Sequence, residues 1–179
     1  MKQQEVLHFW FQELTPKQWW IKDPALDDTI KRRFLPLHEA ARTGELFSWR
    51  TSAEGRLAEI LILDQFSRNI FRGLAESFAY DPVALVLAQE AVRSGADQKT
   101  SVDKRAFFYL PYMHSESLKI HQEALHLFSQ KGLEGNLDFE RRHLEIIERF
   151  GRYPHRNEIL KRSSTQEEIE FLKTPGSSF

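Results

Sequence analysis

The feature that most constrains the fold of this chain is a largely apolar stretch, residues 57–73, with the sequence LAEILILDQFSRNIFRG. On a helix with 3.6 residues per turn, its large aliphatic and aromatic side chains fall on two opposite sides: Leu57, Ile60 and Leu61 on one, and Ile62, Leu63 and Phe66 on the other. A helix that is apolar all round is normally buried all round. We therefore predict a buried central helix over about residues 52–66, followed by a turn that ends at Gly73.

Polar residues interrupt this buried helix. Asp64 falls in the middle of one apolar face, and Arg68 follows four residues later, the spacing at which helical side chains meet. We expect an Asp64–Arg68 ion pair, with Asn69 and Arg72 close behind. Buried polar groups cost free energy unless they are satisfied, so this set is either a structural network or a site. The sequence pattern does not separate these two readings.

The rest of the chain also has helical periodicity. No stretch alternates with period two for long enough to be a strand, and no Asn-Gly or Asp-Gly hairpin signal is present. We predict an all-α fold of roughly eight to ten helices, in a single domain over residues 1–173 with a frayed tail at 174–179. We expect a kink or break before Pro36 and a stop or kink at Pro111. Besides the central helix, the predicted segments are 3–14, a short helix after Pro16, 24–43, 81–95, 103–111, 114–132, 137–150, 157–161 and a last helix that ends at Lys173.

Composition excludes several classes of function. The formal net charge of the 179 residues is −1, which gives no overall basic field for nucleic acid or a membrane surface. There is no cysteine, and so no disulfide, thiolate nucleophile or thiolate metal site. The first residues lack the apolar core of a secretory signal, and no apolar run is long enough to span a membrane. We expect a soluble cytoplasmic protein with no nucleic acid or membrane partner, no metal and no cofactor.

One segment is dense in arginine and histidine: RFGRYPHRN, residues 149–157. Its three arginines and His155, on a turn shaped by glycine and proline, could bind a carboxylate or a phosphate. Alternatively, Arg152 and Arg156 cap the preceding helix and pair with nearby glutamates. The spacing matches no named phosphate-binding loop.

Two other histidines are candidates for chemistry. His143 lies on an apolar helix face, where a histidine is usually a hydrogen-bonded core residue; if it is buried, the Asp64 network is a possible partner. His114 and Glu116 follow Pro111, and they could either act in acid–base chemistry or cap the next helix. No metalloprotease motif, nucleophile elbow or Walker loop is present.

The four tryptophans, Trp10, Trp19, Trp20 and Trp49, are expected to lie in the core. The alternative is that an exposed pair of them forms a shelf for a bound peptide.

Four motifs resemble those of the bacterial family known as domain of unknown function 924: LDQFSRNIFRG (63–73), YDPVAL (80–85), YLPYMHSE (109–116) and RFGRYPHRN (149–157). The resemblance runs from about residue 6 to residue 172 and implies a tetratricopeptide-like α–α superhelix. A repeat of Gln-Glu-Ala at 89–91 and 122–124, 33 positions apart, agrees with this fold. The resemblance departs at Lys161, where glycine is common. Its polar motif positions are Asp64, Arg68, Asn69, Arg72, His114, Glu116, Arg152, His155, Arg156 and Asn157.

The resemblance carries no activity, so three hypotheses stay open. The first, which the sequence favours, is a non-enzymatic binding or adaptor module, whose groove of arginine and His155 side chains takes a small anionic ligand, a peptide or a protein; its arginines are Arg68, Arg72, Arg152 and Arg156. The second is an acid–base enzyme of hydrolase type that uses His114, Glu116, Asp64 or His143. The third is a purely structural buried network. A histidine and a carboxylate facing one enclosed cavity would favour the enzyme.

Overall fold

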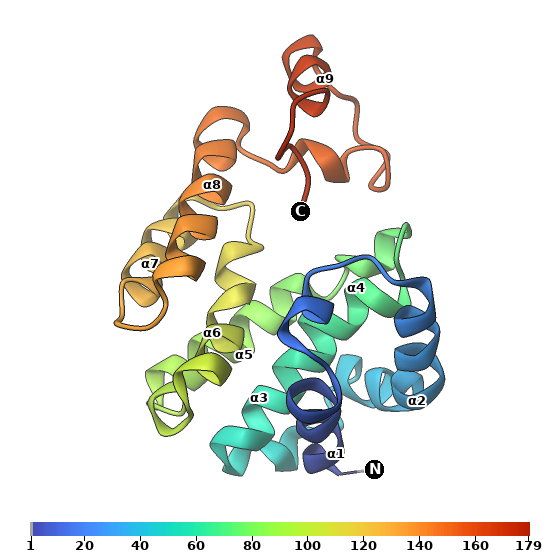
Figure 1. Cartoon of the computed structure of the whole chain (residues 1–179), viewed down its shortest axis with the longest axis vertical. Helices are drawn as coiled ribbons and strands as arrows, with labels where there is room; N and C mark the ends of the chain where they lie inside the picture. Colours follow the sequence, from blue (N-terminus) through green and yellow to red (C-terminus); the bar gives the residue numbers. More distant parts are fainter. Residues whose placement is uncertain (1) are drawn as a thin grey trace.

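The computed structural model describes residues 2–179, and every regular element in that range is helical (Figure 1). The all-α prediction is confirmed. The α-helices are α1 (Gln3–His8), α2 (Pro24–Arg42), α3 (Ala53–Leu61), α4 (Ser67–Ile70), α5 (Asp81–Arg93), α6 (Val102–Met113), α7 (Leu118–Phe128), α8 (Glu134–Phe150) and α9 (Gln166–Leu172). Short 3₁₀ turns lie at Pro16–Trp19, Phe47–Thr51, Ala75–Ser77, Asp97–Lys99 and Pro154–Arg156, and π turns at Phe9–Glu13 and Ile62–Phe66.

The central helix is built from α3, the π turn Ile62–Phe66 and α4, which follow one another without a break. Ser52 caps its first turn, because the Ser52 hydroxyl accepts a hydrogen bond from the Gly55 amide at 3.0 Å. All residues from 57 to 67 are buried, as predicted. The helix ends four residues beyond the predicted limit at residue 66, because the π turn continues the helical path to Ile70.

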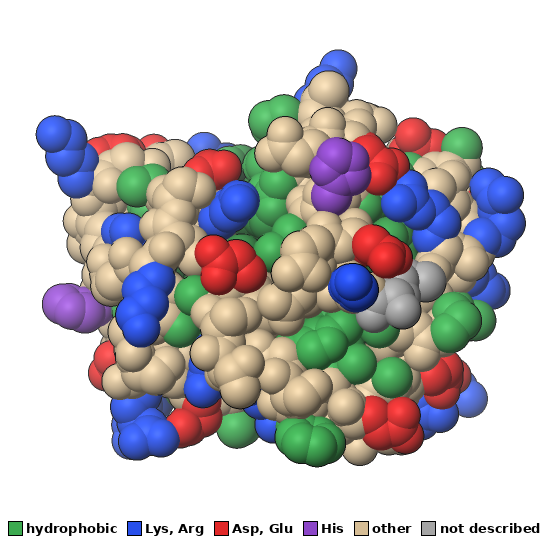
Figure 2. Space-filling model, turned by 90° about the horizontal axis from the view of Figure 1, so that it is seen from below, with side chains coloured by type: hydrophobic (Ala, Val, Ile, Leu, Met, Phe, Trp, Pro, Cys, Tyr) green, Lys and Arg blue, Asp and Glu red, His purple; other side chains and the backbone are tan. Residues whose placement is uncertain are grey.

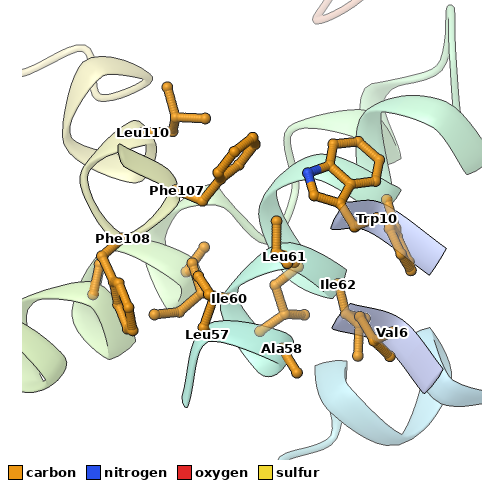
Figure 3. Packing of buried hydrophobic residues seen from close by; sticks show 14 of the residues in the cluster. Val6, Trp10, Leu57, Ala58, Ile60, Leu61, Ile62, Phe107, Phe108 and Leu110 are labelled. Carbon is orange, nitrogen blue, oxygen red and sulfur yellow. The ribbon is translucent and has the colours of Figure 1, made fainter. Parts of the chain in front are cut away.

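The core forms around this helix. Figure 3 shows side chains of α3 directed toward Phe107 and Phe108 of α6 on one side, and toward Val6 and Trp10 on the other. Helix α5 packs on α6, α6 on α7 and α7 on α8, while α1 packs on α3 and α2 on α4. Packing of consecutive helices is what an α–α superhelix requires. A smaller hydrophobic cluster of Ile146, Ile147 and Tyr153 joins α8 to α9.

Pro36 and Pro111 both lie inside helices, so of the predicted alternatives the break before Pro36 and the stop at Pro111 are wrong. α2 continues through Pro36, and α6 continues past Pro111 to Met113. A proline removes the hydrogen bond to the carbonyl four residues earlier, here that of Arg32, an exposed residue whose carbonyl can bond to water. Burial of Phe34 and Leu37 on either side holds α2 together.

The segment after the Arg/His-rich turn also differs from the prediction. Residues 157–161 form an irregular turn rather than a helix. Lys161 has a φ of 55°, a left-handed conformation that ends helical geometry and favours glycine. The Arg162 amide then bonds to the Asn157 carbonyl at 2.8 Å, which closes the turn.

We expected the tail 174–179 to be frayed, but in the structure it folds back on the end of α9. Ser177 is buried and donates a hydrogen bond to the Leu172 carbonyl at 3.2 Å. In Figure 1 the C-terminal end points into the space between α8 and α4. Acidic and basic side chains are interspersed on the face drawn in Figure 2, with no large patch of one sign. None of the helices within residues 2–179 has the length and apolarity needed to cross a membrane.

Candidate active site

A cavity of about 760 Å³ opens between the central helix, the end of α6, the start of α8 and the segment 11–22. It gathers most of the polar residues that the sequence singled out. Seven of the ten candidate site residues line it: Arg68, Asn69, Arg72, His114, His143, His155 and Arg156. Asp64 lies directly behind His114, whereas Glu116 and Arg152 are not among the lining residues.

The central contact of this site joins Asp64 to His114. Nδ1 of His114 lies 2.7 Å from Oδ1 of Asp64, and the Asp64 side chain is only 1% exposed. The other carboxylate oxygen of Asp64 accepts a hydrogen bond from the side-chain amide of Gln65 at 2.6 Å. The π turn and the C-terminal end of α6 bring these groups together, because Asp64 lies in the former and His114 is the residue that ends the latter.

The protonation state of the pair follows from its surroundings. Burial would raise the pKa of the Asp64 carboxyl, but His114, Arg68 and the hydrogen bonds to it lower that pKa to about 2. Burial and the Arg68 charge lower the pKa of His114, and this effect exceeds the opposing effect of Asp64. At neutral pH His114 is therefore neutral and donates its Nδ1–H to a carboxylate, which leaves the lone pair on Nε2.

The Nε2 atom of His114 is open to the cavity. His114 lines the cavity and its side chain is 16% exposed. Nε2 makes no hydrogen bond to any residue in the described range 2–179, and it is not among that range's fully buried polar atoms. An oriented imidazole with a free lone pair, next to a cavity, is able to accept a proton from a bound molecule.

Arg68 connects this pair to a second carboxylate. The predicted Asp64–Arg68 contact is present at 3.4 Å, but the nearer partner is Asp81, which Arg68 binds through two hydrogen bonds of 2.9 and 3.0 Å. Arg68 also donates to the Asp64 carbonyl at 2.8 Å. Asp81 was not among the candidate site residues predicted from the sequence. The signal that could have revealed it is its place in the motif YDPVAL.

Arg156 lies on the same wall, between two aromatic rings. Its guanidinium carbon is 4.5 Å from the Phe78 ring centre and 4.7 Å from that of Tyr153. It donates to the His114 carbonyl at 2.9 Å and lies 3.3 Å from Asp81, while its buried Nε has no partner within residues 2–179. Arg156 thus lines the cavity with one buried guanidinium N–H that no group in the described residues satisfies.

The other two histidines of the cavity are not bound to Asp64. His143 donates from Nδ1 to the Phe139 carbonyl at 2.7 Å, and burial lowers its pKa to about 3. Burial, together with the charges of Arg156 and Arg68, lowers the pKa of His155 to about 4. Nδ1 of His155 is buried and has no partner in the part of the chain that the structure describes. Both rings are neutral at neutral pH.

The remaining candidates are tied into structural contacts. Glu116 pairs with Arg162 at 2.7 and 2.9 Å, and it also accepts the Tyr153 amide. Arg152 pairs with the buried Glu168. These contacts hold the 152–162 turn against the rest of the molecule.

Two more candidates lie at the cavity but are also occupied. Arg72 binds Asp27 through two hydrogen bonds, and Asn69 donates to the same carboxylate at 2.8 Å. Because Asp27 and Asp81 pair with the cavity arginines, much of the positive charge of these arginines is balanced.

The chemistry of the lining is limited in two ways. Among the described lining residues there is no serine, threonine or cysteine, so the wall supplies no hydroxyl or thiol nucleophile of the usual kind. In residues 2–179 no three His, Cys, Asp or Glu side chains are grouped as a metal site would need.

The tryptophans divide between the core and the cavity. Trp10 is buried, as expected, whereas Trp19 and Trp20 line the cavity and Trp20 is 58% exposed. The Trp20 ring stacks on Phe107 with centres 6.0 Å apart. Of the two tryptophans at the cavity only Trp20 is exposed, so the alternative of an exposed pair is not met.

Comparison with known proteins gives a family and a fold but no activity. Residues 6–176 match the sequence model of a protein family that is described as bacterial protein of unknown function (DUF924). A solved structure titled as a protein of unknown function, ATU0120 from Agrobacterium tumefaciens, is 44% identical, with a TM-score of 0.91 and 96% of each chain covered. No curated protein matches this chain.

Proposed function

The chain belongs to the DUF924 family of bacterial proteins, and from this premise we propose that it is an acid–base enzyme of hydrolase type with His114 as the general base. The observation that carries the proposal is how the two nitrogens of the His114 imidazole are bonded. Nδ1 of His114 is bound by a buried carboxylate 2.7 Å away, while Nε2 is free at the cavity. This is the arrangement of a histidine prepared to take a proton.

Asp64 is a positioning residue in this proposal. Its carboxylate fixes the His114 tautomer and stabilises the imidazolium that forms when Nε2 takes a proton. The hydrogen bond from Gln65 and the neighbouring charge of Arg68 keep Asp64 ionised, although it is buried. A protonated Asp64 could not perform this role.

In this proposal the nucleophile is a water molecule, because of the residues that line the cavity. Since the described lining residues include no serine, threonine or cysteine, a covalent intermediate on such a group is not expected. A water proton passes to Nε2 of His114 while the water oxygen forms a bond to the electrophilic carbon of an acyl group, and the carbonyl π electrons move to its oxygen. The guanidinium of Arg156, which lines the cavity, is suited to stabilise that oxyanion. The imidazolium then returns its proton to the leaving group as the bond to that group breaks.

Two other readings have less support. A binding module for an anion accounts for the unsatisfied N–H of Arg156, but the cavity arginines are largely neutralised by Asp81 and Asp27. A purely structural network accounts for Glu116 and Arg152, but not for the open Nε2 of His114.

The test is a panel of chromogenic carboxylic esters, amides and phosphoesters, assayed with the wild type and His114→Asn. Asparagine keeps a donor for Asp64 and removes the base. We expect hydrolysis of a subset, with kcat lower by about 10²- to 10⁴-fold in the variant and an unchanged melting temperature. The control is His8→Asn, at an exposed histidine outside the cavity, which should hydrolyse at the wild-type rate. Panel compounds that bind without turnover, or hydrolysis that persists in His114→Asn, would contradict the proposal.

A further inference from the structure

We propose that the ligand of this cavity is amphipathic, with a ring-sized apolar arm next to its polar reacting group, and that the Phe179 ring occupies the place of this arm in the free protein. The inference deepens the proposed function and rests on it only in placing the polar group at His114.

The apolar part of the cavity is exposed to an unusual degree. Four of the ten large hydrophobic side chains that are exposed in the described chain line this one cavity: Trp20, Ile21, Phe139 and Phe179. Single exposed apolar residues are normal on a protein surface, but a group of them around one cavity indicates a binding surface. The stacking of Trp20 on Phe107 fixes one flat aromatic wall.

The polar part comes from several elements. His114 ends α6, Arg68 lies in α4, and Arg156 belongs to the 3₁₀ turn Pro154–Arg156. The apolar wall comes from the segment 16–22, the start of α8 and Phe107 of α6. A molecule that fills the cavity therefore meets both apolar surface and the base with its arginines.

The Phe179 ring shows that the cavity accepts an aromatic group. Its centre lies 3.7 Å from that of the His143 ring, with 24° between the planes, and 6.2 Å from that of His155. Burial keeps both imidazoles neutral, so they offer flat, uncharged surfaces to a ring. Phe179 is still 48% exposed, so a ligand ring that displaces it removes less buried contact than displacement of a core ring would.

The experiment compares two carboxylates that differ only in the apolar arm, 2-naphthoate and acetate. Binding is measured by titration calorimetry and by the fluorescence of the tryptophans at the cavity. We expect 2-naphthoate to bind about 10- to 100-fold more tightly than acetate. Phe179→Ala should strengthen naphthoate binding several-fold, because the competing ring is gone. Trp20→Ala should weaken naphthoate binding and leave acetate unchanged.

Matched variants separate this inference from the proposed function. Phe47→Ala, at a 68% exposed ring outside the cavity, should bind both probes as the wild type does. His114→Asn should retain naphthoate binding, since the base is not needed for it. Equal affinity for the two carboxylates, or weaker naphthoate binding in a Phe179→Ala protein of unchanged melting temperature, would overturn the inference. Naphthoate binding without hydrolysis of any panel compound would instead contradict only the proposed function.

Discussion

Nδ1 of His114 lies 2.7 Å from Oδ1 of Asp64, across 50 positions of sequence, and this contact joins the end of α6 to the π turn of the central helix. The contact explains how a carboxylate is accommodated in the buried central helix. It also fixes which nitrogen of His114 faces the cavity. The predictions below follow from this pair and from the charges around it.

The rate should depend on pH through His114. Burial and the Arg68 charge lower the pKa of His114 below its usual 6.5, and only the neutral ring can take a proton. We therefore expect kcat/KM for a hydrolysed ester to be constant from pH 8 to below pH 6.5 and to fall in acid, with one inflection. An inflection above pH 7 would contradict the lowered pKa.

Removal of the carboxylate shared by two arginines should destabilise the protein strongly. Asp81 binds both Arg68 and Arg156, and the side chains of all three are less than one fifth exposed. Asp81→Asn leaves both cations with reduced compensation, and we expect a loss of about 3–5 kcal/mol in the free energy of unfolding, measured with urea. The control is Asp138→Asn in the surface pair with Arg141, which should leave the unfolding midpoint unchanged. Equal effects of the two variants would refute this explanation.

Stability should decline in weak acid because of buried histidines. Burial lowers the pKa of His143 to about 3, whereas in the unfolded chain it is near 6.5. Between these values the unfolded state binds a proton that the native state does not, so the free energy of unfolding falls as pH falls, by up to about 1.4 kcal/mol per pH unit. Urea unfolding from pH 7 to 4.5 should give a shallower decline for His143→Gln than for the wild type. Parallel curves would show that His143 is not the group responsible.

The left-handed backbone conformation of Lys161, near the end of the 152–162 turn, should carry strain. Lys161 has a φ of 55°, which costs a residue with a side chain roughly 1 kcal/mol. We expect Lys161→Gly to raise the melting temperature, and Gly44→Ala, at a φ of 78° with open space around the glycine, to lower it. A Lys161→Gly protein that melts below the wild type would count against strain at this position.

Much of the fold could be predicted from the sequence because its signals are local. The apolar run around Asp64 and the helical periodicity of the other segments each depend on a few neighbouring residues. The Asp64–Arg68 contact could be predicted for the same reason. The predicted break at Pro36 was wrong, because packing of α2 on the central helix offsets the hydrogen bond that the proline removes.

The partners in the site could not be predicted in this way. His114 and His143 both follow helical patterns, and only the path of the chain decides that His114 meets Asp64 while His143 bonds to its own helix. Arg152 and Arg156 lie in one motif, yet one binds Glu168 outside the cavity and the other lies beside the base. Long-range contacts of this kind are set by tertiary packing, which a single sequence does not display.

The measurement that tests the central claim most directly is the tautomer of His114, read from ¹H–¹⁵N NMR of the imidazole nitrogens at pH 7. The signals are assigned by their loss in His114→Asn. The proposal predicts a proton on Nδ1 and a bare Nε2, with Asp64→Asn shifting the ring toward the Nε2–H form. A proton on Nε2 in the wild type, or a doubly protonated ring at pH 7, would contradict the role of His114 as a general base.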